Sequence, residues 1–147
     1  MRGPRAGSPD RAECPVRKPV AVAVGESLPT GETGPVTQTD IVRFAGAGGD
    51  FNPLHHDPEF SAAAGFPGVL AMGQFQAGLL AAWLTDWCGI EHLREYEVRF
   101  VAPVFLGNRL RFSGEVTAIE SGVAELVLRV TRGDEEIVRA AARVAVA

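Results

Sequence analysis

The chain has 147 residues, of which 46% are hydrophobic and 22% are charged, so it is long enough to bury one sizeable core. Its formal net charge is −4, and five of its basic residues stand in the first 18 positions. The remainder is therefore more acidic still, which excludes a broad nucleic-acid-binding surface. The two cysteines, Cys14 and Cys88, are too few for a disulfide framework and fit reduced thiols in a cytoplasmic protein.

Residues 1–18 are basic and contain several prolines and glycines, and they lack the apolar stretch of a secretory signal. We predict that they form a disordered leader and that residues 19–147 form the folded domain. The most apolar run, Val69–Leu84, is interrupted by glycines and glutamines. It is too short and too polar to cross a bilayer, so no membrane partner is expected.

A first helix is predicted after Thr37, because Thr37 and Asp40 have the spacing of a capping box. It is predicted to end in the run Gly46–Gly49, which holds a helix poorly. A phosphate-binding loop is disfavoured there, because the run follows a helix and no lysine-containing P-loop pattern comes after it. Residues 50–72 are predicted to be irregular, with one helical turn at 59–64.

From Gly73 to Cys88 the pattern is helical again, with large apolar side chains on one side and alanines and glycine on much of the other. Such a helix is predicted to be buried nearly all round and to end at Gly89. The last third is predicted to form strands, at residues 96–100, 110–116, 126–130 and 137–146. The predicted hairpin turns are Gly107-Asn108, Ser121-Gly122 and Gly133-Asp134. One helix against consecutive antiparallel strands is an α+β fold.

Residues 50–57 read DFNPLHHD and are the densest stretch in catalytic residue types. A metal site is disfavoured, because His55, His56 and Asp57 are consecutive and adjacent side chains diverge. Nucleophilic hydrolysis is disfavoured because there is neither a GxSxG motif nor a cysteine beside a histidine. General acid–base chemistry remains, because the proline turn can bring Asp50 and His55 to one side of a cleft.

Each of these residues also has a purely structural interpretation. Asp50 could cap the segment after the glycines, and His55 could be a hydrogen-bonded core histidine. Asn52 is expected to cap backbone groups of the turn, and His56 and Asp57 are expected to face solvent or to start a helix.

Gly73 favours the catalytic interpretation. It stands at the start of the second long helix, where free N–H groups and the helix dipole favour a negatively charged oxygen. Glycine also permits a ligand to approach the backbone closely. Such a terminus, about 20 residues after an acid–base pair, suits chemistry on a carbonyl compound that passes through an enolate.

DFNPLHHD followed by GFPGVLAMGQFQAGLL resembles the signature of the MaoC-like (R)-specific enoyl-thioester hydratases, over roughly residues 35–147. The resemblance implies a single hot-dog domain at 19–147, with a long central helix wrapped by an antiparallel sheet. It implies that Asp50 and His55 hold the reacting water and that the backbone N–H of Gly73 binds the thioester oxygen.

The resemblance also implies supporting or substrate-binding roles for a further set of residues: Asn52, Met72, Phe75 and Ala81. Two of these depart from the family pattern. Met72 stands where the family commonly has histidine, and Ala81 stands near the place of a frequent serine.

The implied reaction is reversible addition of water to a 2-enoyl thioester of coenzyme A or acyl carrier protein, giving a 3-hydroxyacyl thioester. No metal and no redox cofactor are expected. The resemblance implies a homodimer, or a heterodimer with a related hot-dog subunit. Two other functions stay open: a hot-dog acyl thioesterase, and a subunit that needs a partner for activity.

Overall fold

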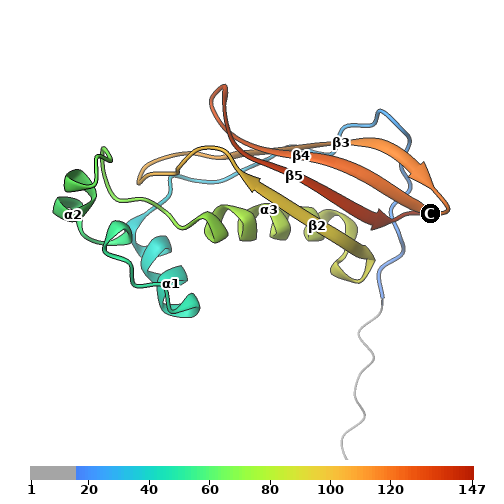
Figure 1. The fold of residues 1–147 in the computed structure, drawn as a ribbon. Coiled ribbons are helices and arrows are strands. Elements are labelled where there is room, and N and C mark those ends of the chain that lie inside the picture. Colours follow the sequence, from blue (N-terminus) through green and yellow to red (C-terminus); the bar gives the residue numbers. More distant parts are fainter. Residues whose placement is uncertain (1–15) are drawn as a thin grey trace, which may run out of the picture.

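The computed structural model describes residues 16–147, so most of the predicted leader lies outside the described residues. The short strand β1 and all the helices come first in the described chain and four consecutive long strands follow them, so the α+β prediction is confirmed (Figure 1). In chain order the elements are β1 (Gly31–Glu32), α1 (Gln38–Gly48), the 3-10 turn η1 (Pro53–His55), α2 (Pro58–Ala63), α3 (Gly73–Cys88), the 3-10 turn η2 (Ile90–His92), β2 (Leu93–Phe100), β3 (Arg111–Glu120), β4 (Val123–Arg132) and β5 (Glu135–Ala145).

The strands form one antiparallel sheet in the order β1-β3-β4-β5-β2. Two of the predicted hairpin turns are confirmed. Ser121 and Gly122 join β3 to β4 with φ values of 51° and 74°, the positive φ values of a type I′ turn. Gly133 and Asp134 join β4 to β5.

The third predicted hairpin, at Gly107-Asn108, is wrong. Gly107 does adopt a positive φ of 82°, and the Asn108 side chain accepts a hydrogen bond from the Phe105 N–H at 2.9 Å. This turn nevertheless lies in the connection between β2 and β3, which are separated by β4 and β5 in the sheet. The dipeptide indicates a tight turn, but long-range pairing decides whether the two strands on either side of it pair with each other.

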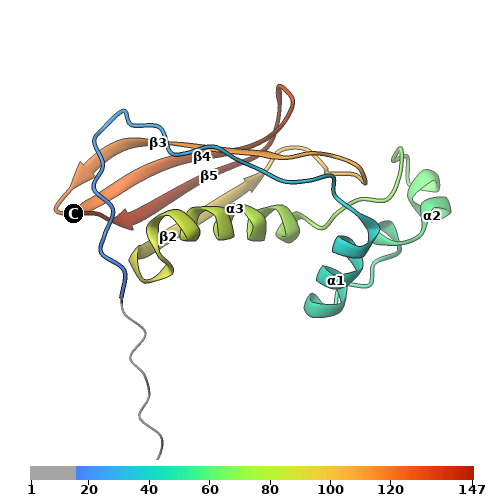
Figure 2. The ribbon, with the colours of Figure 1, turned by 180° about the vertical axis from the view of Figure 1, so that it is seen from behind.

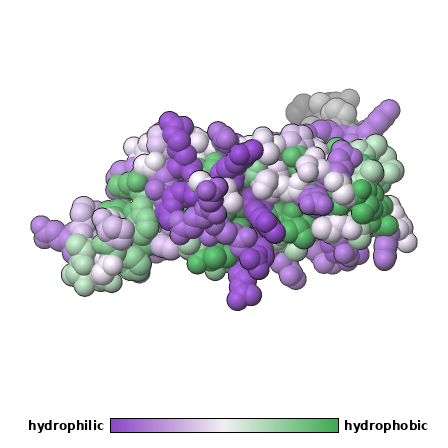
Figure 3. Space-filling model, turned by 90° about the horizontal axis from the view of Figure 1, so that it is seen from above, coloured by the Kyte–Doolittle hydropathy of each residue, from purple (hydrophilic) through white to green (hydrophobic). Residues whose placement is uncertain are grey.

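The sheet curves over α3, and the core lies between them (Figure 1). On β4, buried Leu126 and Leu128 alternate with exposed Glu125, as a sheet with one covered face requires. The opposite face of the sheet is largely hydrophilic (Figure 3) and carries ion pairs such as Arg143–Glu95 at 2.9 Å. Within residues 16–147 there is no helix long and apolar enough to cross a membrane.

The prediction that α3 is buried nearly all round is wrong for the single chain. Only one side of it is buried, through Gln76, Leu80, Leu84 and Cys88. The side away from the sheet is exposed and carries mostly small or polar residues, at Gln74, Gly78, Ala82 and Asp86. A single sheet can cover only one side of a helix, so an apolar pattern alone overestimates burial here.

The helix α1 and the segment after it lie beyond the N-terminal end of α3 (Figure 2). The predicted capping box is confirmed: Asp40 donates its N–H to the Thr37 hydroxyl, and its carboxylate accepts the Thr37 N–H at 2.9 Å. The Phe44 ring then meets the Phe75 ring of α3 edge to face, with centroids 5.7 Å apart. These contacts bring the loop that follows α1 to the start of α3.

The other end of α3 is held by Arg17. Its guanidinium donates to the carbonyl oxygens of Thr85 and Asp86, both at 3.0 Å, where the helix dipole favours a positive charge. Its backbone N–H donates to the Glu91 carboxylate at 2.8 Å.

Leu84 provides a test of the contact between helix and sheet. Its side chain is 0% exposed, so we expect Leu84→Ala to lower the free energy of unfolding by about 2–5 kcal/mol through lost burial and a residual cavity. Leu106→Ala is the matched control, because Leu106 is 40% exposed, and it should change stability by less than about 0.5 kcal/mol. Urea unfolding of both variants measures the difference, and equal losses would contradict this core.

Tyr96 provides a test of how β2 sits on α3. Its hydroxyl donates to the carbonyl oxygen of Ala77 at 2.8 Å, and burial raises the pKa of Tyr96 to about 12. The pKa of Tyr96 in the folded chain is above its usual value of 10.0. The Tyr96 hydroxyl therefore contributes its full stabilisation below pH 10, and this contribution is lost as pH rises through 12.

Tyr96 is the only tyrosine, so tyrosinate absorbance reports this group alone. We expect a midpoint near 12 in the folded chain, with folding followed by circular dichroism, and near 10 in urea. A midpoint near 10 in the folded chain would show that the hydroxyl is not buried against α3.

Candidate active site

Asp50 is the first residue after the glycine that ends α1. Gly49 adopts the left-handed conformation, with φ 69°, which turns the chain out of the helix. The Asp50 N–H still donates to the Ala45 carbonyl at 3.1 Å, which ties the loop to the helix. The Asp50 carboxylate accepts the Asn52 N–H at 3.3 Å, and its side chain remains 47% exposed. Asp50 is thus positioned by the backbone but open to an approaching molecule.

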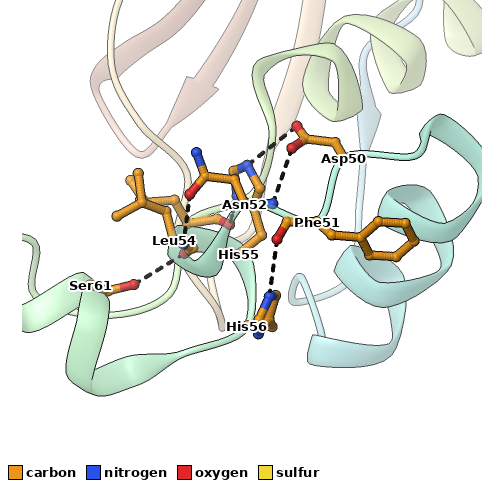
Figure 4. A network of polar contacts seen from close by, with 8 residues as sticks. Asp50, Phe51, Asn52, Leu54, His55, His56 and Ser61 are labelled. Atoms are coloured by element: carbon orange, nitrogen blue, oxygen red, sulfur yellow. Dashed lines mark hydrogen bonds and ion pairs between the residues drawn. The ribbon is translucent and has the colours of Figure 1, made fainter.

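The predicted turn around Asn52 and Pro53 is the short helix η1. The Asn52 side chain caps it by accepting the Leu54 N–H at 3.0 Å, and Pro53 occupies the first helical position, where a missing N–H costs nothing (Figure 4). His55 ends this turn, which directs its ring back toward Asp50. The capping role expected for Asn52 is confirmed.

The His55 ring is held in one tautomer. Its Nδ1 lies 2.8 Å from the carbonyl oxygen of Leu70, and a carbonyl can only accept, so Nδ1 carries a proton. In the neutral ring Nε2 then has a free lone pair. This Nε2 lies 3.5 Å from Asp50 Oδ2 (Figure 4).

The chemistry of the pair follows from this tautomer. A neutral Nε2 and a carboxylate oxygen are both acceptors, so neither can donate a hydrogen bond to the other. The arrangement is stable when a proton is shared between them or when a water molecule donates one hydrogen to each. The His55 side chain is 12% exposed and that of Asp50 is 47% exposed, so the carboxylate is the side of the pair open to solvent.

Three further groups support His55, and the side-chain pattern of the sequence does not predict them. The Leu54 carbonyl accepts both the Leu70 N–H at 3.0 Å and the hydroxyl of fully buried Ser61 at 3.1 Å. The Gln38 side chain donates to the His55 carbonyl at 3.1 Å. Backbone acceptors such as Leu54 O and Leu70 O have no signature in the side-chain pattern, so only the folded chain reveals them.

Gly73 is the first residue of α3, three positions after Leu70. The N-cap residue, Met72, is buried and makes no side-chain cap hydrogen bond. Within residues 16–147 the N–H groups of Gly73 and Gln74 have no protein acceptor. The first turn of α3 therefore offers free donors and the positive end of the helix dipole.

The other predicted site residues lie along α3 or beside the loop. Phe75 is half-buried against Phe44, and Ala81 is half-buried two turns beyond Gly73. His56 is exposed, as predicted, and Asp57 caps α2 by accepting the Glu59 N–H at 2.9 Å. No three metal-ligating side chains cluster in the part of the chain that the structure describes.

Comparison with known proteins identifies a family. The family model described as MaoC like domain matches residues 19–138. The 3-oxo-4,17-pregnadiene-20-carboxyl-CoA hydratase beta subunit of Mycobacterium tuberculosis is 34% identical over 99 residues, which are 65% of this chain and 77% of that protein.

Two solved structures share the fold. A chain of the ChsH1-ChsH2 complex from Mycobacterium tuberculosis superposes with a TM-score of 0.76 and 27% identity, over 85% of this chain and 98% of that one. The (R)-hydratase from A. caviae involved in PHA biosynthesis superposes with a TM-score of 0.75 and 27% identity, over 86% of this chain and 98% of that one. The hot-dog fold is thereby confirmed.

The tautomer of His55 can be measured directly. At a pH where the rings are neutral, we expect His55 to carry its proton on Nδ1 and His56 to carry it on Nε2, because His56 Nε2 lies 3.3 Å from the Phe51 carbonyl. Long-range nitrogen–proton correlation spectra of histidine-labelled protein distinguish the two tautomers. A proton on Nε2 of His55 would contradict the geometry of the site.

Proposed function

The chain belongs to the MaoC-like dehydratase family, and on this basis we propose that it is a hydro-lyase that adds water reversibly to a 2-enoyl thioester and forms a 3-hydroxyacyl thioester. The observation that carries the proposal is the Asp50–His55 pair, in which the Leu70 carbonyl binds Nδ1, so that the Nε2 lone pair of the neutral ring faces Asp50 Oδ2. The relatives named as a CoA hydratase and an (R)-hydratase support the reaction class.

The pair would hold the reacting water. A water molecule between His55 Nε2 and Asp50 Oδ2 donates one hydrogen to each acceptor, which leaves its oxygen lone pair free to attack. The oxygen bonds to the β-carbon of the enoyl group, the pair takes one proton from the water, and the pair returns one proton to the α-carbon. The two groups thus end in the protonation state in which they began, and the reaction needs no metal and no redox cofactor.

The first turn of α3 would stabilise the charge that develops on the thioester oxygen. Attack at the β-carbon moves electrons onto this oxygen as enolate character develops. The free N–H of Gly73 and the dipole of a 16-residue helix favour that negative charge. One such donor is typically worth about 10²–10³ in rate. The acyl group would lie near three residues at the start and middle of α3, namely Met72, Phe75 and Ala81.

The substrate would be carried by coenzyme A or by acyl carrier protein, and the enzyme would work as a homodimer or with a related hot-dog subunit. Two features support a partner. Within residues 16–147, β2 pairs only with β5, so its other edge is open, and the side of α3 away from the sheet is exposed. The relatives include one named a beta subunit and one solved as a complex.

Substitution of the pair tests the proposal. We expect Asp50→Asn and His55→Gln each to lower kcat/KM for a short 2-enoyl-CoA by about 10²–10⁴, because each removes one of the two proton acceptors. His56→Gln is the matched control, since His56 is exposed and its ring bonds only the Phe51 carbonyl within residues 16–147, and it should retain activity within about twofold.

Loss of the conjugated-enoyl absorbance measures hydration, and a thiol reagent measures any free coenzyme A. If Asp50→Asn and His55→Gln keep the wild-type rate, the assigned chemistry is wrong. Release of free thiol without hydration would favour a thioesterase instead.

A further inference from the structure

The ring of Phe100 lies against the first turn of α3. Phe100 is the last residue of β2, where it pairs with Val138 of β5. A Cβ atom placed on Gly73 would be 3.2 Å from both Cε1 and Cζ of this ring, which is closer than an ordinary van der Waals contact. The ring thus occupies the space that a side chain at residue 73 would need.

The register of β2 places Phe100 there. Tyr96, Val98 and Phe100 share the face of β2 that looks toward α3, because side chains alternate along a strand. The Tyr96 hydroxyl bonds the carbonyl of Ala77, one turn of α3 beyond Gly73. After Phe100 the strand ends, where the N–H of Val101 donates to the Ile137 carbonyl at 2.9 Å. The backbone of Phe100 is therefore fixed on the sheet side, and its ring reaches Gly73.

Phe100 remains 49% exposed although its side chain is large and apolar. It is in contact with Gly73, one of the two residues of this turn whose N–H lacks a protein acceptor within residues 16–147. The ring fills the space on the Cβ side of Gly73 and so excludes water from that side of the residue that carries the free donor. A hydrogen bond from that donor to a negatively charged oxygen is then stronger, because the local dielectric constant is lower.

We propose that Phe100 is a positioning residue, whose ring holds the first turn of α3 and shields the thioester oxygen bound at Gly73 from water. This inference rests on the proposed function. It assigns a second reason for glycine at residue 73, namely that the ring leaves no room for a Cβ atom. The ring packs against Gly73, whose N–H would bind the oxygen. It takes no part in proton transfer.

Kinetics test the shielding. We expect Phe100→Ala to lower kcat about tenfold or more while KM for a short 2-enoyl-CoA changes less than about threefold, because the lost effect acts on the developing charge. Phe100→Tyr keeps the ring and should retain most of kcat. Val101→Ala is the control, since Val101 is the next residue and is 52% exposed, and it should leave kcat unchanged. An unchanged kcat in Phe100→Ala would overturn the inference.

Stability tests the packing without reference to activity. Gly73→Ala keeps the N–H but forces the Phe100 ring to move by a few tenths of an ångström. We expect Gly73→Ala to lower the thermal midpoint in the wild-type background and not in the Phe100→Ala background, where the space is free. Equal changes in both backgrounds would overturn the contact.

The two proposals fail in different ways. If the wild type hydrates enoyl-CoA and Asp50→Asn does not, while Phe100→Ala keeps its full kcat, the role of Phe100 is wrong and the proposed function stands. If the wild type has no hydratase activity, the proposed function is wrong, and the role assigned to Phe100 falls with it.

Discussion

The hydrogen bond from His55 Nδ1 to the Leu70 carbonyl is the contact on which the candidate site depends. It joins two segments that are 15 residues apart and fixes the proton on one ring nitrogen. Without it, Nε2 could carry the proton and donate directly to Asp50, and the ring would then offer no lone pair to a water molecule between the two groups. The same bond ties the loop after α1 to the strand-like segment that leads into α3. One backbone acceptor thus sets both the chemistry of His55 and its place in the fold.

The N-terminal turn of α3 is held by contacts from both the loop and the sheet. The loop carrying Asp50 and His55 reaches it through Leu70, and the sheet reaches it through Phe100 at the end of β2. The N-cap residue, Met72, is buried and has no polar side chain, so the first N–H groups have no protein acceptor in the described part of the chain. Each of these is an ordinary packing feature, but together they leave donors unpaired at a helix terminus, where a negatively charged oxygen is most stable.

The sequence predicts those features that rest on local pattern. The capping box at Thr37, the bounds of α3 and the alternation of β4 are all local, and the structure confirms them. The spacing of Asp50 and His55 across Asn52 and Pro53 likewise indicates that the pair can meet, because the asparagine cap and proline define the turn. Local capping, propensity and pattern are enough to predict these elements, because they agree with the fold.

The remaining features depend on long-range contacts that side-chain patterns do not encode. The acceptor for His55 is a backbone carbonyl, and any residue at position 70 would supply it. The contact of Phe100 with Gly73 requires the register of β2 against β5, and the partial exposure of α3 follows from one sheet covering one side of it. The misplaced hairpin at Gly107 has the same origin, since strand order is a property of the whole sheet.

In the proposed reaction, Asp50 and His55 direct water to the β-carbon of an enoyl thioester and not to its carbonyl carbon. The most direct measurement is mass spectrometry of the product formed from a short 2-enoyl-CoA in water enriched in oxygen-18. We predict an intact thioester that carries one heavy oxygen at carbon 3. Heavy oxygen in the carboxylate of a free acid, with release of the thiol, would contradict it.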